Sequence, residues 1–273
     1  MPKPLCISSM DFKQQKPLEV SRLSSFMMII EALVYQDIKS ESGNIAGGLL
    51  YKFLRPIILT VLIAIVVGAF RGTYDLEYSI QILFLNFLVF FFMMEQISGT
   101  EKLTTQKNLL NLPKVSIFKL LLARSLSSIT IFMPQMFFSF LVYYFLLEQF
   151  NYVMFFEIYV FAWAISLGYF LIVSLILFDN NFLLQLHQLF SRSLLFLSAV
   201  FYPLEILPES FHVYFLVNPL VGIMEITRDF AGYQGDTFYN TSYLIAVLCF
   251  LFIVFPIVYY LRIRIFFYGK RKL

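Results

Sequence analysis

The sequence predicts an all-α membrane protein with six transmembrane helices, and three observations lead to this class. Of the 273 residues, 60% are hydrophobic and 14% are charged, and the mean hydropathy is +0.79. Soluble domains are about 45–50% apolar and about 25% charged. Six apolar stretches approach the roughly 20 residues that a membrane-spanning helix needs. Basic residues cluster between alternate stretches, as they do in cytoplasmic loops.

The chain forms a single transmembrane domain, 1–273, in this interpretation. The six spans are expected at 52–70, 79–98, 117–147, 152–178, 182–202 and 243–261. His187 and Arg192 interrupt the fifth span. We expect it to end at the step from Tyr202 to Pro203, because proline lacks an N–H and clashes with the preceding turn.

The distribution of basic residues predicts the orientation. With the N-terminus inside, Arg71 and Arg228 are the only two of the 20 Lys and Arg residues that fall in outer segments. Cytoplasmic loops carry the excess of positive charge. The chain is therefore expected to be a multi-pass membrane protein with both termini in the cytoplasm.

Residues 22–41 predict an amphipathic helix ahead of the first span. Ile29, Ile30 and Leu33 recur at helical spacing, and charged residues lie between the apolar positions. This pattern is typical of a helix that lies on the membrane surface. A simple anchor and an interface with a cytoplasmic partner are both open interpretations.

The inner loop between the second and third spans predicts a short helix at 100–112. Thr100 is a suitable N-cap, and Pro113 would end the helix. Glu101, Lys102 and Lys107 make it too polar to span a membrane. A contact with another protein and a solvated connector are the two alternatives.

The segment 203–233 predicts a gate on the outer side. Pro203, Pro208 and Pro219 interrupt it, and aromatic residues alternate with acidic ones. Broken backbone at membrane depth is tolerated only where protein or a water-filled path covers it. We therefore expect short, half-buried helices that belong to a transport pathway.

The sequence contains no motif for catalysis or for nucleotide binding. HExxH, GxSxG and Walker-type loops are absent, and Cys6 and Cys249 have no metal-binding spacing. We expect neither a metal, nor a cofactor, nor a nucleic-acid partner for this chain. An ATP-driven process would need a separate ATPase chain.

Three stretches resemble the membrane subunit of ABC-type polysaccharide exporters, the capsule-export permeases and their O-antigen and teichoic-acid relatives. They are ALVYQDIKSE before the first span with Leu54-Arg55-Pro56, the loop NLLNLPKVSIFKLLLARSL at 108–126, and the outer segment at 196–233. The outer segment holds the family's proline pair, its Asn-Pro-Leu step and its Glu-x-x-Arg pair. Ala199 stands where relatives more often have glycine.

The resemblance implies a homodimer bound to two cytoplasmic ATPase subunits, which hold ATP and magnesium. It further implies a lipid-linked polysaccharide substrate, a periplasmic co-polymerase and an outer-membrane export channel. The residues expected to face the ATPase are Glu31, Asp37, Lys39, Glu101, Lys102 and Lys107.

A lipid-linked phosphate needs a cation near the inner mouth of its route. Arg55 and Arg192 are placed for this role, although each could instead extend to the lipid headgroups. We expect Lys52 and Arg124 to extend to the headgroups. Glu95 is expected to pair with one of these four cations. Aromatic rings suit the apolar faces of sugars, and the expected outer pathway residues are Phe201, Tyr202, Phe211 and Phe215.

Besides a purely structural assembly subunit, two other functions are compatible with the sequence. One is an exporter of O-antigen, teichoic acid or another lipid-linked glycan with the same architecture. The other is a membrane-embedded transferase, which would need acidic or histidine residues converging on one face of the membrane domain.

Overall fold

A computed structural model of the chain is built of helices. It describes residues 22–39, 47, 50–51, 54–55, 57–62, 65, 76–105, 115–146, 150–178, 180–233 and 235–270, and every regular element among them is a helix. The all-α class is therefore confirmed. The elements are α1 (Arg22–Lys39), α3 (Leu76–Thr105), α4 (Ile117–Leu146), α5 (Tyr152–Leu177), α6 (Asn181–Leu197), η2 (Leu204–Ile206), α7 (Glu209–Leu216), α8 (Pro219–Phe230) and α9 (Thr241–Lys270).

Four of these helices are long and apolar enough to cross a membrane. Their candidate spans are Ile82–Leu103, Ile117–Phe145, Tyr152–Leu177 and Thr241–Arg264. The pair α7 and α8, bent by 109°, gives a fifth if it is counted as one broken span. The chain is thus a multi-pass membrane protein. The span predicted at 52–70 lies largely outside the described residues.

The helix α6 ends earlier than the sequence predicts. We expected the fifth span to run to Tyr202, but α6 stops at Leu197 and is 17 residues long. The chain leaves the helix at Ser198 and Ala199, and Ala199 has a φ of 52°, in the left-handed region. Pro203 lies beyond this break, so proline is not what ends the helix.

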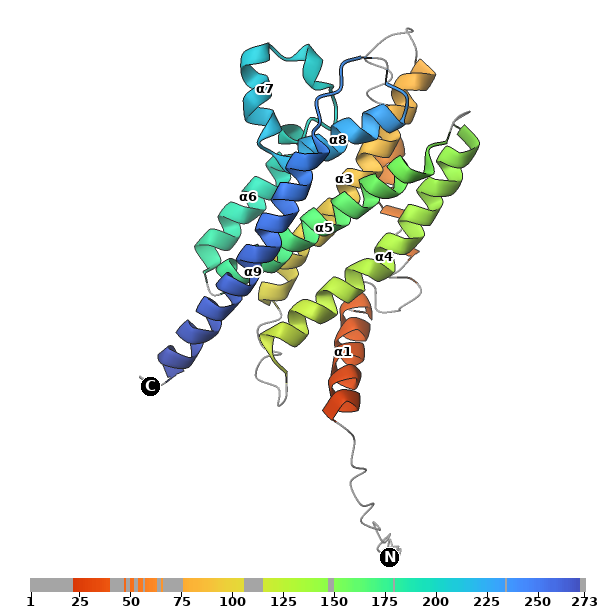
Figure 1. Cartoon of the computed structure of the whole chain (residues 1–273). Coiled ribbons are helices and arrows are strands. Elements are labelled where there is room, and N and C mark those ends of the chain that lie inside the picture. The colour runs from red at the N-terminus through yellow and green to blue at the C-terminus, as the bar shows by residue number, and fades with distance from the viewer. Residues whose placement is uncertain are drawn as a thin grey trace, which may run out of the picture.

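The two ends of the molecule differ in what they contain. In Figure 1, α1 and the last turns of α9 lie at one end, and α7 and α8 lie at the other. The helix α3 packs against α4, α5, α6 and α8, and its span is mostly buried. Little of the α9 span is fully buried, although α9 packs against α5, and about half of its residues are exposed, which leaves a surface for lipid or another chain.

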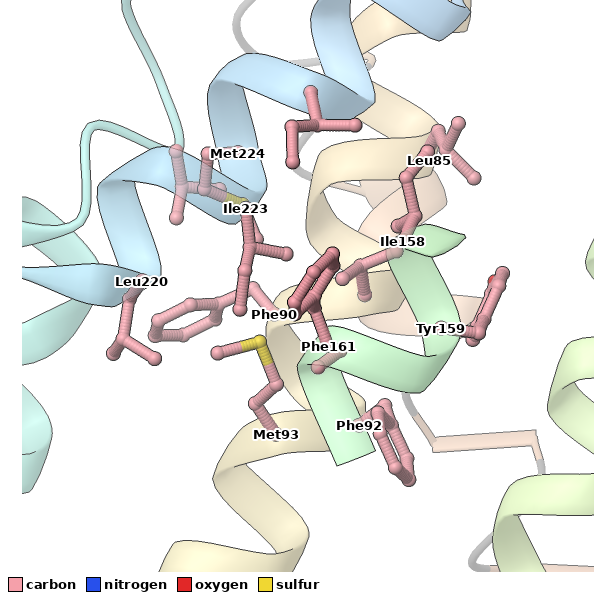
Figure 2. Packing of buried hydrophobic residues seen from close by; sticks show 14 of the residues in the cluster. Leu85, Phe90, Phe92, Met93, Ile158, Tyr159, Phe161, Leu220, Ile223 and Met224 are labelled. Carbon is pink, nitrogen blue, oxygen red and sulfur yellow. The ribbon is translucent and has the colours of Figure 1, made fainter. Parts of the chain in front are cut away.

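The main hydrophobic cluster joins α3, α5 and α8 in the half of the molecule near α7. Figure 2 shows Phe90 and Met93 of α3 beside Phe161 of α5, with Ile223 and Met224 of α8 above them. A second cluster joins α1, the start of α4 and the C-terminal half of α5. Trp163 of α5 packs against both clusters.

The predicted amphipathic helix is present as α1. Ile30 and Leu33 are buried in the second cluster, while Met27, Met28 and Tyr35 are exposed. The Nζ of Lys119, in the first turn of α4, lies 5.5 Å from the ring centre of Phe26. The contact with α4 explains one apolar face of α1. Its position on a membrane surface stays a prediction.

The helix predicted at 100–112 does not begin where we expected. The helix α3 continues through Thr100 to Thr105 without a break. Thr100 is buried there, and its Oγ1 accepts a hydrogen bond of 3.4 Å from Ser174 Oγ, so it does not cap a new helix. Residues 106–114 lie outside the described part of the chain.

Candidate functional site

A charged cavity lies between α3, α6 and the described residues that precede α3. Its volume is about 570 Å³, within the range of small-molecule sites. Its apolar lining residues include Leu59, Met94 and Leu195, together with two phenylalanines of α3. Its polar lining residues include Arg55, Ser98, Ser191, Glu95, Glu101, Lys102 and Arg192.

One face of α3 supplies both apolar and polar lining residues to this cavity. Phe91, Met94, Glu95, Ser98 and Lys102 all line it. These positions are three or four residues apart, so they form a stripe along the helix. The stripe changes from apolar to charged toward the end of α3 that lies near α1. The lining that α3 gives to the cavity therefore becomes more polar in the same direction.

Glu95 is the counter-ion of two cations. Its Oε1 lies 3.2 Å from Lys102 Nζ and 3.8 Å from Arg124 Nη2. We expected Arg124 to extend to the lipid headgroups, but its side chain is buried. That expectation is wrong because a carboxylate is available inside the protein, and a paired buried charge avoids most of the cost of losing water. The prediction that Glu95 pairs with a basic residue of this group is confirmed.

Glu101 faces α6 across the cavity. Its Oε2 accepts a hydrogen bond of 3.3 Å from Gln188 Nε2, and its Oε1 lies 3.9 Å from His187 Nδ1. Arg192, one helical turn beyond Gln188, is close enough to Glu101 to interact with it electrostatically. Glu101 is therefore the point at which α3 and α6 meet through charge.

The structure brings two of the predicted pathway residues together and separates the others. Arg55 and Arg192 line the same cavity. Phe201 and Tyr202 lie after α6, where the Tyr202 ring centre is 6.2 Å from that of Phe215. Phe211 is exposed on α7. The predicted pathway residues thus form two groups. The charged group is Arg55 and Arg192, which line the cavity, and the aromatic group is Phe201, Tyr202, Phe211 and Phe215, which follow the end of α6.

The predicted ATPase-facing residues are also divided. Glu31 and Lys39 are exposed on α1. Glu101 and Lys102, in contrast, belong to the cavity. Asp37 lies in α1, but its side chain is outside the described set, and Lys107 lies in an undescribed stretch. Only α1 therefore presents described, exposed side chains from this set.

Sequence reasoning missed the contribution of α6 beside Arg192. Gln188, Ser191 and Leu195 follow the same helical stripe as Arg192 and complete one wall of the cavity or hold Glu101. The signal was the spacing of three and four residues around Arg192. The interpretation of this stretch as part of a membrane span that continues to Tyr202 did not draw attention to it.

A buried ion pair organises the break after α6. Arg228 and Glu225 of α8 are nearly inaccessible to solvent and bond to each other. The guanidinium also donates to the carbonyl oxygens of Ala199 and Tyr202, the latter at 2.7 Å. Glu225 Oε2 accepts from the backbone N–H of Phe238 at 3.2 Å. The pair therefore joins the end of α6, α8 and the segment that leads to α9.

Glu205 fastens the same segment from the outside. Its carboxylate accepts from the Tyr233 hydroxyl and, at 2.9 Å, from the backbone N–H of Asp236. Burial and the Glu205 carboxylate raise the pKa of the Tyr233 phenol, so the hydroxyl stays a donor. A Cβ on Gly235 would lie 2.5 Å from Glu205 Oε2, so a larger residue there would displace the Glu205 carboxylate.

Substitution of Ala199 tests the break directly. Ala199 is fully buried at a φ of 52°, which only glycine adopts without strain. We expect Ala199→Val to lower the free energy of unfolding by about 2–4 kcal/mol, since a β-branched side chain adds both strain and overpacking. Ala199→Gly should keep the stability within about 1 kcal/mol. Thermal unfolding of the purified protein in detergent measures both, and equal effects would contradict the assignment.

A second, apolar cavity of about 420 Å³ lies under α7. Its lining includes Leu194 and Leu197 of α6, Tyr214 and Phe215 of α7, and Leu251 of α9. Among the described residues, it shares no lining residue with the charged cavity. Of the predicted aromatic pathway residues, Phe215 lines this apolar cavity.

Comparison with known proteins indicates which class of protein has this arrangement. No family model matches the chain. Two proteins of Escherichia coli, each named polysialic acid transport protein KpsM, are 24% identical to it over 206 residues. The aligned region covers 73% of this chain and 80% of each relative. The chain is therefore distantly similar, over most of its length, to polysialic acid transport proteins.

Proposed function

We propose that this chain is the membrane permease subunit of an ATP-driven ABC exporter that moves lipid-linked capsular polysaccharide across the inner membrane. The supporting observation is a distant similarity to polysialic acid transport proteins in a chain with several candidate membrane spans. The charged cavity adds a site whose chemistry suits such a substrate. The protein itself transports, and ATP hydrolysis takes place on a separate chain.

The cavity suits the lipid-proximal part of the substrate. A phosphate attached to a hydrocarbon chain needs cations beside an apolar wall. Arg55, Lys102 and Arg192 supply the cations, and Phe91 and Leu195 belong to the wall. Guanidinium groups bind phosphate through two parallel hydrogen bonds. We infer that the headgroup enters the exporter here, with the arginines on its phosphate.

The aromatic group suits the exit of the sugar chain. Tyr202 and Phe215 pack together beside the break after α6, and Tyr202 Oη donates to the carbonyl of Phe196 at 2.8 Å. In a homodimer, the same rings from both subunits would face each other across the two-fold axis. Such rings can close an empty pathway and stack on sugar faces during passage.

The partners follow from the same proposal. Two ATPase subunits, which bind ATP and magnesium, would dock at the end of the molecule that holds α1 (Figure 1). A periplasmic co-polymerase and an outer-membrane channel would receive the polymer at the opposite end. The exposed charges of Glu31 and Lys39 suit the ATPase contact, and Asp37 and Lys107 are assigned to it from sequence alone.

Charge reversal on α1 tests the ATPase contact. We expect Glu31→Lys combined with Lys39→Glu to weaken capture of the ATPase by about tenfold, since mismatched charges at an interface oppose binding. Pull-down of the ATPase by the detergent-purified chain measures this. Glu209→Lys, at the opposite end of the molecule, is the matched control and should capture the ATPase normally. Equal capture by the α1 variant and the wild type would remove α1 from the interface.

Thiol labelling tests the orientation. With Cys6 and Cys249 replaced by serine, single cysteines at Glu209 and Asp236 should react with an impermeant reagent in cells with a permeabilised outer membrane. A cysteine at Lys270 should react only after lysis, because basic segments stay in the cytoplasm. The reverse pattern would overturn the proposed orientation.

Reconstitution tests the function itself. Proteoliposomes that contain the chain and its ATPase should move lipid-linked polysaccharide only when ATP is hydrolysed. Presenting capsular, O-antigen and teichoic-acid substrates in parallel distinguishes the exporters of the same architecture. Formation of a new covalent product without net movement would instead favour a membrane-embedded transferase.

A further inference from the structure

His187 is a buried polar residue whose contacts call for an explanation. Both ring nitrogens are inaccessible to solvent and have no hydrogen-bond partner within the described part of the chain. Buried polar groups are almost always hydrogen-bonded, and exceptions often mark a functional element. The ring of Tyr169 lies 5.9 Å away, centre to centre, and packs on one face of the imidazole. The Tyr169 ring holds His187 in place but gives its nitrogens no described partner.

The nearest acidic group to His187 is already occupied. Glu101 Oε1 lies 3.9 Å from His187 Nδ1, which is too long for a hydrogen bond. Its other oxygen is bonded to Gln188, and Arg192 acts on the carboxylate electrostatically. A movement of the carboxylate by about 1 Å would bring it within hydrogen-bond distance of the imidazole.

Carboxylates offset part of the positive charge of the cavity. Arg55, Lys102 and Arg192 line it and Arg124 lies 3.8 Å from Glu95, so four positive charges accompany the two negative charges of Glu95 and Glu101. A phosphate group that enters the cavity must therefore compete with carboxylates for the same cations. Like charges that share a site repel each other strongly in a medium of low dielectric constant.

We propose that Glu101 is a displaceable counter-ion: an anionic lipid phosphate takes its place beside Arg192, and His187 receives the displaced carboxylate. This inference rests on the proposed function and names a regulatory step at the same site. In the resting state Glu101 offsets part of the positive charge of the cavity. When the phosphate binds, Glu101 turns from Arg192 toward His187 Nδ1–H, and the unpartnered imidazole gains its hydrogen bond.

The placement of these residues links binding to α6. His187, Gln188 and Arg192 lie within two turns of that helix, and Glu101 lies on α3. A carboxylate that changes partners therefore changes how α3 holds α6. The other end of α6 leads into the break at Ala199. Occupation of the cavity thereby acts on the helix that precedes the outer aromatic group.

A binding experiment on the full chain in lipid nanodiscs tests the displacement. The probes are a polyprenyl phosphate, for lipid-borne phosphate, and inorganic phosphate, for the free ion. Glu101→Gln removes the competing charge and keeps the size of the side chain, so polyprenyl phosphate should bind about tenfold more tightly. Glu157→Gln, the same change on α5 outside the cavity, should leave binding unchanged. If Glu101→Gln also binds inorganic phosphate more tightly than the wild type does, the result supports displacement and shows that the phosphate alone is enough to displace Glu101.

Variants of His187 test its role as the receiving group. His187→Leu should weaken binding of polyprenyl phosphate several-fold in the wild-type chain, but not in the Glu101→Gln background. Such non-additivity is the mark of two residues that act on one step. His187→Gln keeps an N–H donor, so it should bind polyprenyl phosphate with most of the wild-type affinity. That result would show that the weaker binding of His187→Leu comes from the lost donor and not from misfolding.

The outcomes separate this inference from the proposed function. If Glu101→Gln binds polyprenyl phosphate no more tightly than the wild type, the counter-ion role is wrong. Equal weakening by His187→Leu in both backgrounds would refute the receiving role. Either result leaves ATP-driven export by wild-type proteoliposomes unaffected. Conversely, a wild-type chain that exports nothing would refute the exporter proposal whatever the binding data show.

Discussion

Arg192→Gln is expected to reduce polysaccharide export by at least about thirtyfold while the protein still inserts and folds. Arg192 lines the charged cavity, and its side chain is exposed there instead of buried in the core. The loss of a charge that binds a desolvated partner typically costs about 2–5 kcal/mol. ATP-dependent movement of lipid-linked polysaccharide into proteoliposomes measures the effect.

Two further variants make this result specific. Arg192→Lys keeps the charge but loses the forked geometry, so partial export is expected. Arg264→Gln, an exposed cation on α9 outside the cavity, should export normally. Full export by Arg192→Gln would remove the charged cavity from the pathway and return Arg192 to an interaction with lipid headgroups.

Arg228→Met is expected to have the largest effect on stability, with a loss of about 3–5 kcal/mol in the free energy of unfolding. The substitution leaves the Glu225 carboxylate buried without its cation. It also removes the donor to the carbonyl oxygens of Ala199 and Tyr202. Thermal unfolding in detergent measures the loss.

The double variant separates the charge from the geometry. Glu225→Gln combined with Arg228→Met removes both charges, so it should be more stable than Arg228→Met alone. Glu209→Gln, an exposed glutamate of α7, should change stability by no more than about 0.5 kcal/mol. Similar unfolding temperatures for Arg228→Met and Glu209→Gln would show that the pair does not hold the break.

Long apolar runs made much of the fold predictable. The spans expected at 117–147 and 152–178 correspond closely to α4 and α5, because length and hydropathy alone decide such helices. Asn151 also caps α5 by accepting from the N–H of Met154, which is a local signal. Here sequence and structure agree because the information lies within a few residues.

Features set by distant contacts were not predictable. The end of α6 depends on Arg228, which is 29 residues away from the carbonyl it binds at Ala199. Thr100 has the side chain of a capping residue, yet the packing of α3 against α5 carries the helix past it. In both cases tertiary contacts outweighed local preference.

The two arginines of the candidate site and the pairing of Glu95 were predictable, but the contributions of Glu101 and Lys102 were not. Arg55 and Arg192 were expected at one mouth, and the structure places both on one cavity. Glu101 and Lys102 were assigned to a separate helix, so their contribution to that cavity was missed. Reading α3 as one continuous helix puts Glu95 and Lys102 seven residues apart, on the same face.

The position of Trp163 gives the protein a built-in optical probe. It is the single tryptophan of the chain, so indole fluorescence comes from one site. Because the indole packs against both hydrophobic clusters, its emission responds to loosening on either side of the membrane domain. If the two hydrophobic clusters unfold in distinct steps, the emission should change in two stages. If they unfold cooperatively, it should change in a single stage. The unmodified chain can therefore report its own cooperativity.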